Sequence, residues 1–391
     1  MTNNTVEITP VMPEGRLREL NEKNIEAVKL AESIAFNFHP ETIKSIALLV
    51  TKMNSYYSNL IEGNNTTPAE IDKALENEFS KNPVKRNLEF EHVAHIEVQK
   101  KIEELLLNNA DFDICTTEFL KWIHREFYTI IPDEFRNVTG PGGAKINIEP
   151  GEFRKFNVYV GNHLAIDHSD IEGSMNYFCK SYKTEKFGSL EKITAAGASH
   201  HRLAYIHPFA DGNGRTARLF THAYLIKAGI NSRDLWSVSR GFARDRNLYY
   251  SRLANADEKR LHDTDGRGVL SERRLAEFCF YFSETIADQI KFMSSLFEFS
   301  KLFDRIKRYV ESEGTLNSES FLILKETILK GTIKRGSIPE ITGMPERTGR
   351  RELRKLLDKG LLNSDSPKGE LKIAFPATVL EYYFPKLYPA Y

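Results

Sequence analysis

The sequence predicts a mainly α-helical fold, in which a helical core carries one β-hairpin flap and is followed by a small winged helix-turn-helix domain. Apolar residues recur at helical spacing in most segments of 40–298. One stretch punctuated by Gly and Pro, 140–163, instead alternates as a β-hairpin does. After about residue 315, short helix candidates are separated by Gly and Pro, which is typical of a separate small domain.

The composition predicts a globular protein with an ample core, because 41% of the residues are hydrophobic and 28% are charged. The 54 Lys and Arg residues balance 54 Asp and Glu residues, so binding to nucleic acid or a membrane needs a local patch. Cys115, Cys179 and Cys279 are odd in number and far apart, which favours reduced thiols in a cytoplasmic protein. We find neither a signal-peptide pattern nor an apolar run near the ~20 residues that span a bilayer.

The first predicted helix runs from Pro40 to Ile61. Pro40 suits the first helical turn, and Gly63 lies just past the end of the apolar pattern. Residues 1–14 are expected to be an extended tail, and 1–39 as a whole a lead-in to the core. Further helices are predicted at 68–80, 87–108, 116–130, 170–183, 190–205, 214–228, 240–258 and 271–298.

The end of the chain has the element order of a winged helix. A charged helix at 299–313 is expected to link it to the core. "FLILKETILKG", "GSIPEITG" and "PERTGRRELRKLLDKGLL" then predict three short helices, and "NSDSPKGELKIAF" predicts a turn between two strands. We therefore expect four segments: the lead-in 1–39, the helical core 40–298, the linker helix 299–314 and the winged-helix domain 315–391.

A dense polar stretch, "HPFADGNGR", begins at residue 207 and directly precedes the helix predicted at 214–228. Gly212 and Gly214 flank Asn213 and allow close approach of the backbone, so consecutive amides at this helix N-terminus can bind an anion. Arg215 and Arg218 lie three residues apart on the helix, and their guanidinium groups suit phosphate oxygens.

Two further groups in the same stretch add chemistry to this anion site. Asp211 supplies a hard oxygen ligand of the kind that Mg²⁺ shares with phosphates. His207 has an ordinary pKa that suits proton abstraction near neutral pH. Together, the cradle, the metal ligand and the base indicate phosphoryl or nucleotidyl transfer.

The stretch "HPFADGNGRTAR" (His207–Arg218) resembles the Fic family motif H-P-F-x-[D/E]-G-N-G-R-x-x-R and matches every fixed position. "EPGEFRKFNVYVG" (149–161) resembles the family's flap, and "AAGASHHRLAYI" (195–206) the helix that leads into the motif. "SNLIEG" (Ser58–Gly63) resembles the inhibitory motif [S/T]-x-x-x-E-[G/N]. The resemblance covers about residues 40–260, in the family's order.

This resemblance implies a Fic fold and an enzyme that transfers AMP from ATP to a Ser, Thr or Tyr hydroxyl of a target protein, which can be the chain itself. His207 would deprotonate the hydroxyl, and Asp211 would hold Mg²⁺. The remaining motif residues would bind the nucleotide's phosphates; they are Gly212, Asn213 (backbone and side chain), Gly214, Arg215 and Arg218.

The resemblance also implies autoinhibition. Ser58 and Glu62 lie four residues apart, so both side chains leave the same face of their helix. Glu62 would pair with Arg218 and occupy the guanidinium that the γ-phosphate of ATP needs, while Ser58 would hold the helix against the motif loop. Without the downstream motif, the segment would be only a helix end with Gly63 past it.

Two neighbouring segments have both a functional and a structural interpretation. Tyr249 and Tyr250, with Leu253 and Asn255, are candidates for an adenine pocket or for ordinary core. In the flap, Phe153, Arg154, Phe156, Val158 and Val160 are candidates for docking an extended target segment by strand addition. The alternative is a flap that only the rest of the domain stabilises.

The winged-helix domain carries basic residues on its predicted recognition helix, which are Arg347, Arg350, Arg351, Arg354 and Lys355. Such a helix can lie in the major groove of DNA. A solvated basic face on a protein-docking module is the alternative.

Other functions remain open at this stage. His200, His201, His222 and the pair His262–Asp263 suggest a metal-dependent phosphohydrolase, although no helical face combines them with a carboxylate at metal-binding spacing. Within the family, the alternatives are transfer of UMP, phosphate or phosphocholine, or removal of AMP. A nucleotide-sensing DNA-binding regulator is the alternative from another class. The sequence does not show the oligomeric state, and a homodimer is one candidate.

Overall fold

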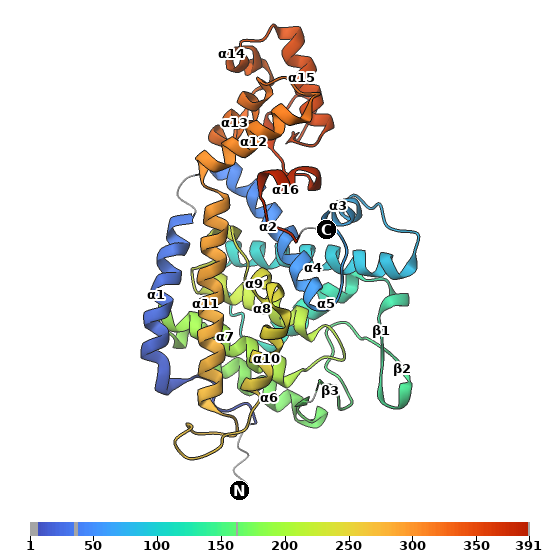
Figure 1. Cartoon of the computed structure of the whole chain (residues 1–391). Coiled ribbons are helices and arrows are strands. Elements are labelled where there is room, and N and C mark those ends of the chain that lie inside the picture. Colours follow the sequence, from blue (N-terminus) through green and yellow to red (C-terminus); the bar gives the residue numbers. More distant parts are fainter. Residues whose placement is uncertain (1–6, 35–37, 162, 390–391) are drawn as a thin grey trace.

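The computed structural model describes residues 7–34, 38–161 and 163–389. Most of the described chain forms a helical body, and a smaller body containing α13, α14 and α15 stands at one end of it (Figure 1). Helix α2 (Pro40–Ile61) runs from this smaller body into the centre of the helical body. None of the described helices is long and apolar enough to cross a membrane.

The helices of the main body agree with the predicted ones within a few residues at most ends. After α2 they are α3 (Pro68–Leu75), α4 (Pro83–Asn108), α5 (Thr117–Ile130), α6 (Ile171–Ser181), α7 (Ser189–Ile206), α8 (Asn213–Lys227), α9 (Val238–Arg244), α10 (Arg246–Ala256) and α11 (Glu272–Leu296). The single helix predicted at 240–258 is wrong, because the chain breaks at Asp245. This side chain accepts a hydrogen bond from the N–H of Leu248 and caps a new helix.

Local signals explain why α2 begins and ends as predicted. Pro40 occupies its first turn, and the His39 side chain accepts a hydrogen bond from the N–H of Glu41. At the other end, Gly63 adopts φ 91°, a left-handed conformation that glycine reaches without strain. The bounds of this helix therefore follow from the sequence.

The lead-in is part of the core. Residues 1–6 of the expected tail lie outside the described residues, but Ile8 and Met12 are buried, and Pro10 accepts hydrogen bonds from Arg202 through its carbonyl oxygen. An unpredicted helix, α1 (Leu17–Ile34), lies along α11 (Figure 1). The described part of the expected tail therefore packs onto the core, and α1 is a helix that the sequence did not predict.

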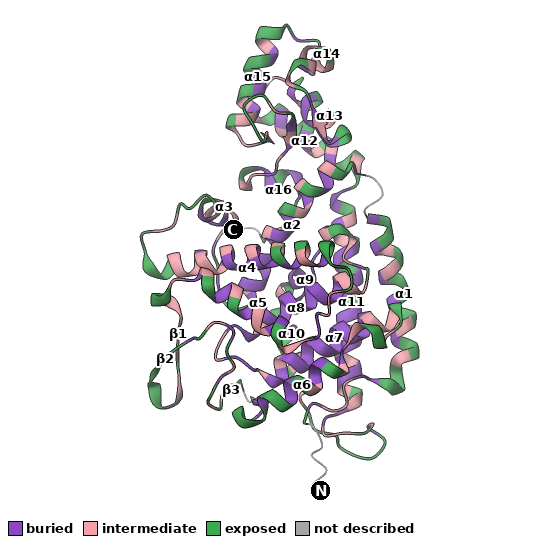
Figure 2. Cartoon of the chain, turned by 180° about the vertical axis from the view of Figure 1, so that it is seen from behind, coloured by how far each residue is buried: buried purple, intermediate pink, exposed green. Residues whose placement is uncertain are grey.

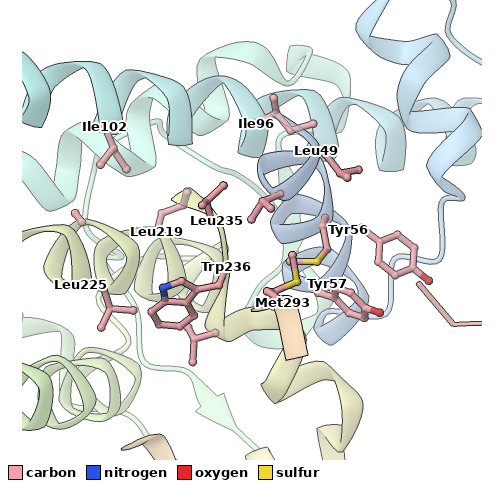
Figure 3. Packing of buried hydrophobic residues seen from close by; sticks show 14 of the residues in the cluster. Leu49, Tyr56, Tyr57, Ile96, Ile102, Leu219, Leu225, Leu235, Trp236 and Met293 are labelled. Carbon is pink, nitrogen blue, oxygen red and sulfur yellow. The ribbon is translucent and has the colours of Figure 1, made fainter. Parts of the chain in front are cut away.

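The centre of the main body is formed by α7 and α8, which are buried along most of their length (Figure 2). Helices α2 and α4 pack against α8. Figure 3 shows part of this core, in which Leu49, Tyr56 and Tyr57 of α2 share one packed cluster with Leu219 of α8 and Trp236. Burial on this scale holds the motif loop between α7 and α8 rigidly in place.

The β-structure of the flap region is shorter than predicted. Strand β1 (Asn137–Thr139) pairs antiparallel with β2 (Lys145–Asn147), and β3 (Tyr159–Val160) pairs with β4 (His163–Leu164). The β1–β2 hairpin projects from the body (Figure 1). Of the alternating run at 156–160, only the last two residues are a strand. Before them, the Phe156 carbonyl oxygen accepts a hydrogen bond from Arg154, and the Asn157 side chain donates to Asp167.

The smaller body has the expected helix–helix–helix–wing order. It contains α13 (Ser320–Lys330), α14 (Ile338–Thr342) and α15 (Glu346–Asp358), with a sheet in the order β5 (Thr332–Ile333), β7 (Leu371–Ile373), β6 (Leu362–Asn363). Strand β5 was not predicted. Helix α12 (Phe299–Glu313) buries Leu302, Ile306 and Val310 against its neighbours and contacts α13 and α16 (Leu380–Tyr383), so it is more than a linker.

Candidate active site

Side chains of the motif loop between α7 and α8 hold the loop in its conformation. His207 ends α7 in a left-handed conformation (φ 52°, ψ 60°). Phe209 is fully buried and stacks on His124, with ring centroids 4.0 Å apart. The Asn213 side chain accepts a hydrogen bond from the N–H of Phe209 and donates one to its carbonyl oxygen, both at 2.8 Å. Both the backbone and the side chain of Asn213 were expected to bind phosphate. Because the side chain bonds within the loop, the backbone amide is the group that remains available to a ligand.

The N-terminus of α8 is approached closely by other groups, which explains its two glycines. At Gly212 (φ 76°), an added Cβ would lie 2.8 Å from the Tyr128 ring. At Gly214, it would lie 2.3 Å from Oε1 of Glu62. The first amides of a helix lack intrahelical partners, and the helix dipole makes this end attractive to anions. The Glu62 carboxylate thus stands where an anionic ligand of this helix would bind.

Arg218 is bound to the end of α2 by three hydrogen bonds. Its side chain is 2% exposed, and it donates to Oγ of Ser58 (2.8 Å), to the carbonyl oxygen of Ser58 (2.9 Å) and to Oε1 of Glu62 (2.5 Å). Burial raises the pKa of the Glu62 carboxyl, but the charges of Arg218 and Arg215 outweigh burial and hold it below its usual value. The pairing of Glu62 with Arg218 that the family resemblance implies is present in the structure.

Arg215 points away from Arg218, although both belong to the same short motif. It forms ion pairs with Glu91 (2.9 Å) and Asp211 (3.3 Å), and its guanidinium lies 5.1 Å from the ring centre of Phe127. Asp211 also accepts a hydrogen bond from the Tyr128 hydroxyl at 2.9 Å. Burial raises the pKa of Asp211, but the Arg215 charge and hydrogen bonds outweigh it and keep the group ionised.

His207 is held neutral at physiological pH. Burial lowers the pKa of His207 to about 4, although the carbonyl oxygen of Ala204 opposes this effect. Nδ1 lies 3.4 Å from this oxygen, which favours the tautomer that carries its proton on Nδ1. Nε2 is then the nitrogen that can accept a proton.

His207, Gly214, Arg218 and Glu62 line one cavity of about 750 Å³. His207, Gly214 and Arg218 of the motif therefore open onto a common space large enough for a nucleotide, whereas Asp211 and Arg215 are not among its lining residues.

A family model described as Fic/DOC matches residues 114–225, which include this motif. The chain contains a Fic domain. A protein adenylyltransferase Fic from Nematostella vectensis is 33% identical over 203 residues, which are 52% of this chain and 42% of that protein. One of the same name from Aedes aegypti is 31% identical over 44% of this chain and 32% of its own length. The chain thus spans less than half the length of these curated relatives.

Solved structures show the same fold at low identity. A Fic family protein from Desulfovibrio desulfuricans G20 has a TM-score of 0.52 at 16% identity and covers 94% of this chain and 96% of its own. Fic-1 from C. elegans (residues 134–508) has a TM-score of 0.52 at 17% identity and covers 73% of this chain and 74% of its own. The fold is therefore that of a Fic domain with a helical core.

The two tyrosines predicted for an adenine pocket of the Fic domain have different environments. Tyr249 is 2% exposed, donates or accepts a hydrogen bond with His200 at 2.7 Å and stacks on Phe242. It therefore belongs mainly to the core, although it reaches the cavity wall. Tyr250 is partly exposed and donates to the carbonyl oxygen of Ile61. Leu253 also lines the cavity, whereas Asn255 is not among its lining residues.

Arg154 was predicted to dock a target, and this prediction is wrong. It is 3% exposed, and its guanidinium donates to the carbonyl oxygens of His207 (2.8 Å), Phe156 (2.8 Å) and Ile166. Its own N–H donates to the carbonyl oxygen of Pro208 (2.9 Å). A buried arginine with backbone acceptors fixes the flap to the motif loop and supports the left-handed turn at His207.

The remaining flap residues divide between anchoring and exposure. Phe153 packs on Phe209, with ring centroids 5.5 Å apart, so it is an anchor. Phe156 and Val158 are partly buried, and the Val158 carbonyl oxygen accepts a hydrogen bond from Ala165. Val160 is exposed and lines the cavity.

On α15, four of the five predicted DNA-binding residues are exposed, namely Arg347, Arg350, Arg351 and Arg354. Lys355 instead donates to the carbonyl oxygen of Thr315 and to the buried Glu352, so it holds the domain together. Arg350 and Arg354 also pair with acids one turn away, Glu346 (2.5 Å) and Asp358 (3.9 Å), which reduces the basic field of this face.

The histidines that suggested a phosphohydrolase are distributed over separate contacts. His200 bonds to Thr221 (2.7 Å) as well as to Tyr249, and His201 bonds to Asp257 (3.0 Å). His222 of α8 lies with Glu103 of α4 and with Asp234 in a separate group, whose ligand atoms are close enough together to hold a metal ion. No metal-binding group combines these histidines with the motif among the described residues.

Sequence reasoning missed three residues that support the site. Glu91 binds Arg215, Tyr128 binds Asp211, and the His124 ring bonds to the Asp211 carbonyl oxygen at 3.2 Å. They come from α4 and α5, and each lies more than 80 residues before its own partner in the motif. No local pattern marks them, since their only signal is a contact across the fold.

Proposed function

We propose that the chain is a protein adenylyltransferase, which transfers AMP from ATP to a Ser, Thr or Tyr hydroxyl of a target protein and, by self-modification, to itself. The observation that carries the proposal is the convergence of His207, Gly214 and Arg218 on one cavity. The name that the curated relatives share supports it.

In this reaction His207 is the general base. Its low pKa keeps the imidazole neutral, so Nε2 can take the proton of the target hydroxyl. The hydroxyl oxygen then forms a bond to the α-phosphorus, and the bond from the α-phosphorus to the α–β bridging oxygen breaks. Pyrophosphate leaves with the electron pair of that bond.

The phosphates would be held at the N-terminus of α8. Backbone amides of Gly212, Asn213 and Gly214 would bind the anion, and the helix dipole would add to their field. Arg215 and Arg218 would stabilise the charge that develops on pyrophosphate. For Arg218, this role requires that it first leaves Glu62.

Asp211 fits the role of a Mg²⁺ ligand. It is an ionised hard-oxygen donor, 45% exposed, directly before the phosphate cradle. When bound, Mg²⁺ would neutralise charge on the α- and β-phosphates.

The ground state is proposed to be autoinhibited. Glu62 occupies Arg218 and lies over Gly214, so the γ-phosphate of ATP and the Glu62 carboxylate would compete for the same positive groups. Ser58 adds two acceptors that hold Arg218 toward α2. Nucleotide would therefore bind weakly or in an unproductive pose while α2 stays in place.

The test is incubation of the purified chain with ATP labelled at the α-phosphate, followed by mass spectrometry of the products. An AMP adduct on protein that His207→Ala lacks supports the proposal. Label that binds without transfer supports a nucleotide sensor. Loss of AMP from a modified protein, or an adduct of another mass, supports the removal or other-group alternatives, in which Glu62 could act as the base for AMP removal.

The finer assignments rest on separate observations. The described cysteines are unpaired and buried, which supports the cytoplasm as the site of action. The exposed arginines of α15 support DNA as a second partner, and a homodimer remains a proposal for the oligomeric state. The proposed limit of the helical core is residue 298, and α12, expected as a linker at 299–314, is assigned to the smaller body together with 315–391.

A further inference from the structure

The end of the described chain leaves the smaller body, which we call the winged-helix body from here on. It packs on α2, the proposed inhibitory helix. Residues 377–389, which we call the C-terminal segment, include α16 and follow strand β7. Figure 1 shows this segment returning from α16 toward α2. Leu387 and Phe384 are each 1% exposed, so the segment is a packed part of the fold.

The C-terminal segment contacts the last turns of α2, next to Ser58. The Tyr57 hydroxyl donates to the carbonyl oxygen of Leu387 at 2.8 Å. The Tyr388 ring packs edge-on against Tyr56 at 5.0 Å and stacks with Tyr57 at 6.2 Å. Arg240 of α9 donates to the Lys386 carbonyl oxygen at 2.8 Å, which ties the segment to the main body.

These contacts lie on the other side of α2 from Arg218. Successive residues of a helix point about 100° apart, so Tyr57 leaves a different face from Ser58 and Glu62. Arg218 holds the Ser58–Glu62 face, and the C-terminal segment holds the Tyr56–Tyr57 face. The inhibitory turn is thus held between the motif helix and the C-terminal segment.

A cavity of about 840 Å³ lies beside this turn, lined among others by Tyr57, Leu60 and Lys386. The C-terminal segment therefore does not fill the space next to α2. If its contacts are lost, the last turn of α2 has room to shift away from Arg218.

The far end of α2 is also attached to the winged-helix body. Thr42 donates to the carbonyl oxygen of Ile328 in α13 at 2.7 Å, and Glu41 lies 3.8 Å from Lys372 of β7. A 22-residue helix is about 33 Å long. One rigid helix therefore contacts the winged-helix body at its start and the nucleotide cradle at its end.

We propose that the C-terminal segment is a clamp that keeps α2 in its inhibitory position, so that a partner that displaces the segment or moves the winged-helix body activates AMP transfer. This regulation rests on the proposed function. The coupling is a two-state one: α2 is either held by both Arg218 and the segment, or displaced from both.

The test compares transfer of α-labelled AMP by full-length variants. Leu387→Asp places a charge in the buried contact, and Tyr57→Phe removes only the hydroxyl that bonds to Leu387. We expect Leu387→Asp to raise transfer about tenfold, the scale expected for Glu62→Gly, because both shift the same equilibrium. Tyr57→Phe should give a smaller rise. In a Glu62→Gly background, each substitution should raise transfer by a smaller factor than in the wild-type chain, because transfer cannot exceed the rate of the fully displaced state.

A matched control is Tyr382→Ala, which removes an exposed aromatic residue of α16 that packs on Tyr309 and not on α2. It should leave transfer unchanged. Hydrogen exchange of the amides at 55–62 provides a second readout, which should accelerate in Leu387→Asp and Tyr57→Phe but not in the control.

The outcomes separate the clamp from the proposed function. If Glu62→Gly itself does not raise transfer, autoinhibition fails. If Glu62→Gly raises transfer while Leu387→Asp and Tyr57→Phe change neither transfer nor exchange at 55–62, the clamp is wrong. A variant that unfolds is recognised by uniform loss of protection, and Tyr57→Phe, which keeps the ring in place, then decides.

Discussion

Glu62→Gly should activate AMP transfer, and the structure sets the scale of the effect. The substitution removes one charge-assisted hydrogen bond to Arg218, which is 2.5 Å long. The Glu62 side chain in this bond is 32% exposed. Such a bond contributes about 1.5–2 kcal/mol, which corresponds to a rise of about 10- to 30-fold at 1.4 kcal/mol per tenfold. Glycine is tolerated here because Glu62 is the C-cap of α2 and not an interior residue.

The assay is the initial rate of α-labelled AMP incorporation at subsaturating ATP. A matched control is Glu76→Gly, which replaces another glutamate at a helix C-cap, in α3, far from the motif in sequence and exposed. The control should leave the rate unchanged. The Glu62 variant should unfold at a slightly lower temperature, since Arg218 loses a partner but keeps Ser58. A flat or lower rate with an intact fold would refute autoinhibition, and a loss confined to AMP removal would assign Glu62 to the reverse reaction.

Further predictions concern the base, its position and the winged helix. His207→Ala should lower transfer by at least about 10²-fold while ATP affinity, measured by calorimetry, stays nearly unchanged. Because burial lowers the pKa of His207 to about 4, the base is neutral above this pH. The contribution of His207 to kcat/KM should therefore stay constant from pH 7 to 5 and fall as the pH drops through 4. Arg154→Ala should lower kcat by about 10²-fold with little change in KM, because it releases the His207 backbone, and Arg154→Lys should restore part of the loss; equal effects on both constants would contradict a positioning role. If α15 binds DNA, joint replacement of Arg350 and Arg351 by Ala should reduce the slope of log affinity against log salt concentration by about two, one for each lost phosphate contact. Absence of binding at low salt would exclude DNA as a partner.

Features with local signals could be predicted from the sequence. The bounds of α2 follow from Pro40 and Gly63, and the motif loop follows from glycines next to a helix start. Helix α1 was missed because its buried stripe contains Ala27 and Ala31, small residues that give a weak apolar pattern. Its packing on α11, and not its own hydrophobicity, accounts for its place in the core.

Features that depend on contacts across the fold could not be predicted. Arg154 looks like a surface residue in sequence because its acceptors are backbone carbonyl oxygens, which leave no trace in residue identity. The same holds for Glu91, whose partner Arg215 lies more than 120 positions later. The Glu62–Arg218 pair was accessible only because a motif resemblance supplied the partner.

The contacts of Arg218 connect inhibition and catalysis quantitatively. The same guanidinium binds α2 in this structure and is needed for the departing phosphates in the proposed reaction, so the two states exclude each other at one side chain. The measured rate is then the rate of the displaced state multiplied by the fraction of molecules in that state, because only this fraction can bind ATP productively. An activation of about 10- to 30-fold in Glu62→Gly would mean that α2 is displaced in at most about 3–10% of wild-type molecules, because the displaced fraction of the variant cannot exceed one. The displaced form then lies at least about 1.3–2 kcal/mol above the inhibited state, and a partner switches AMP transfer on when its binding preference for the displaced form exceeds this difference.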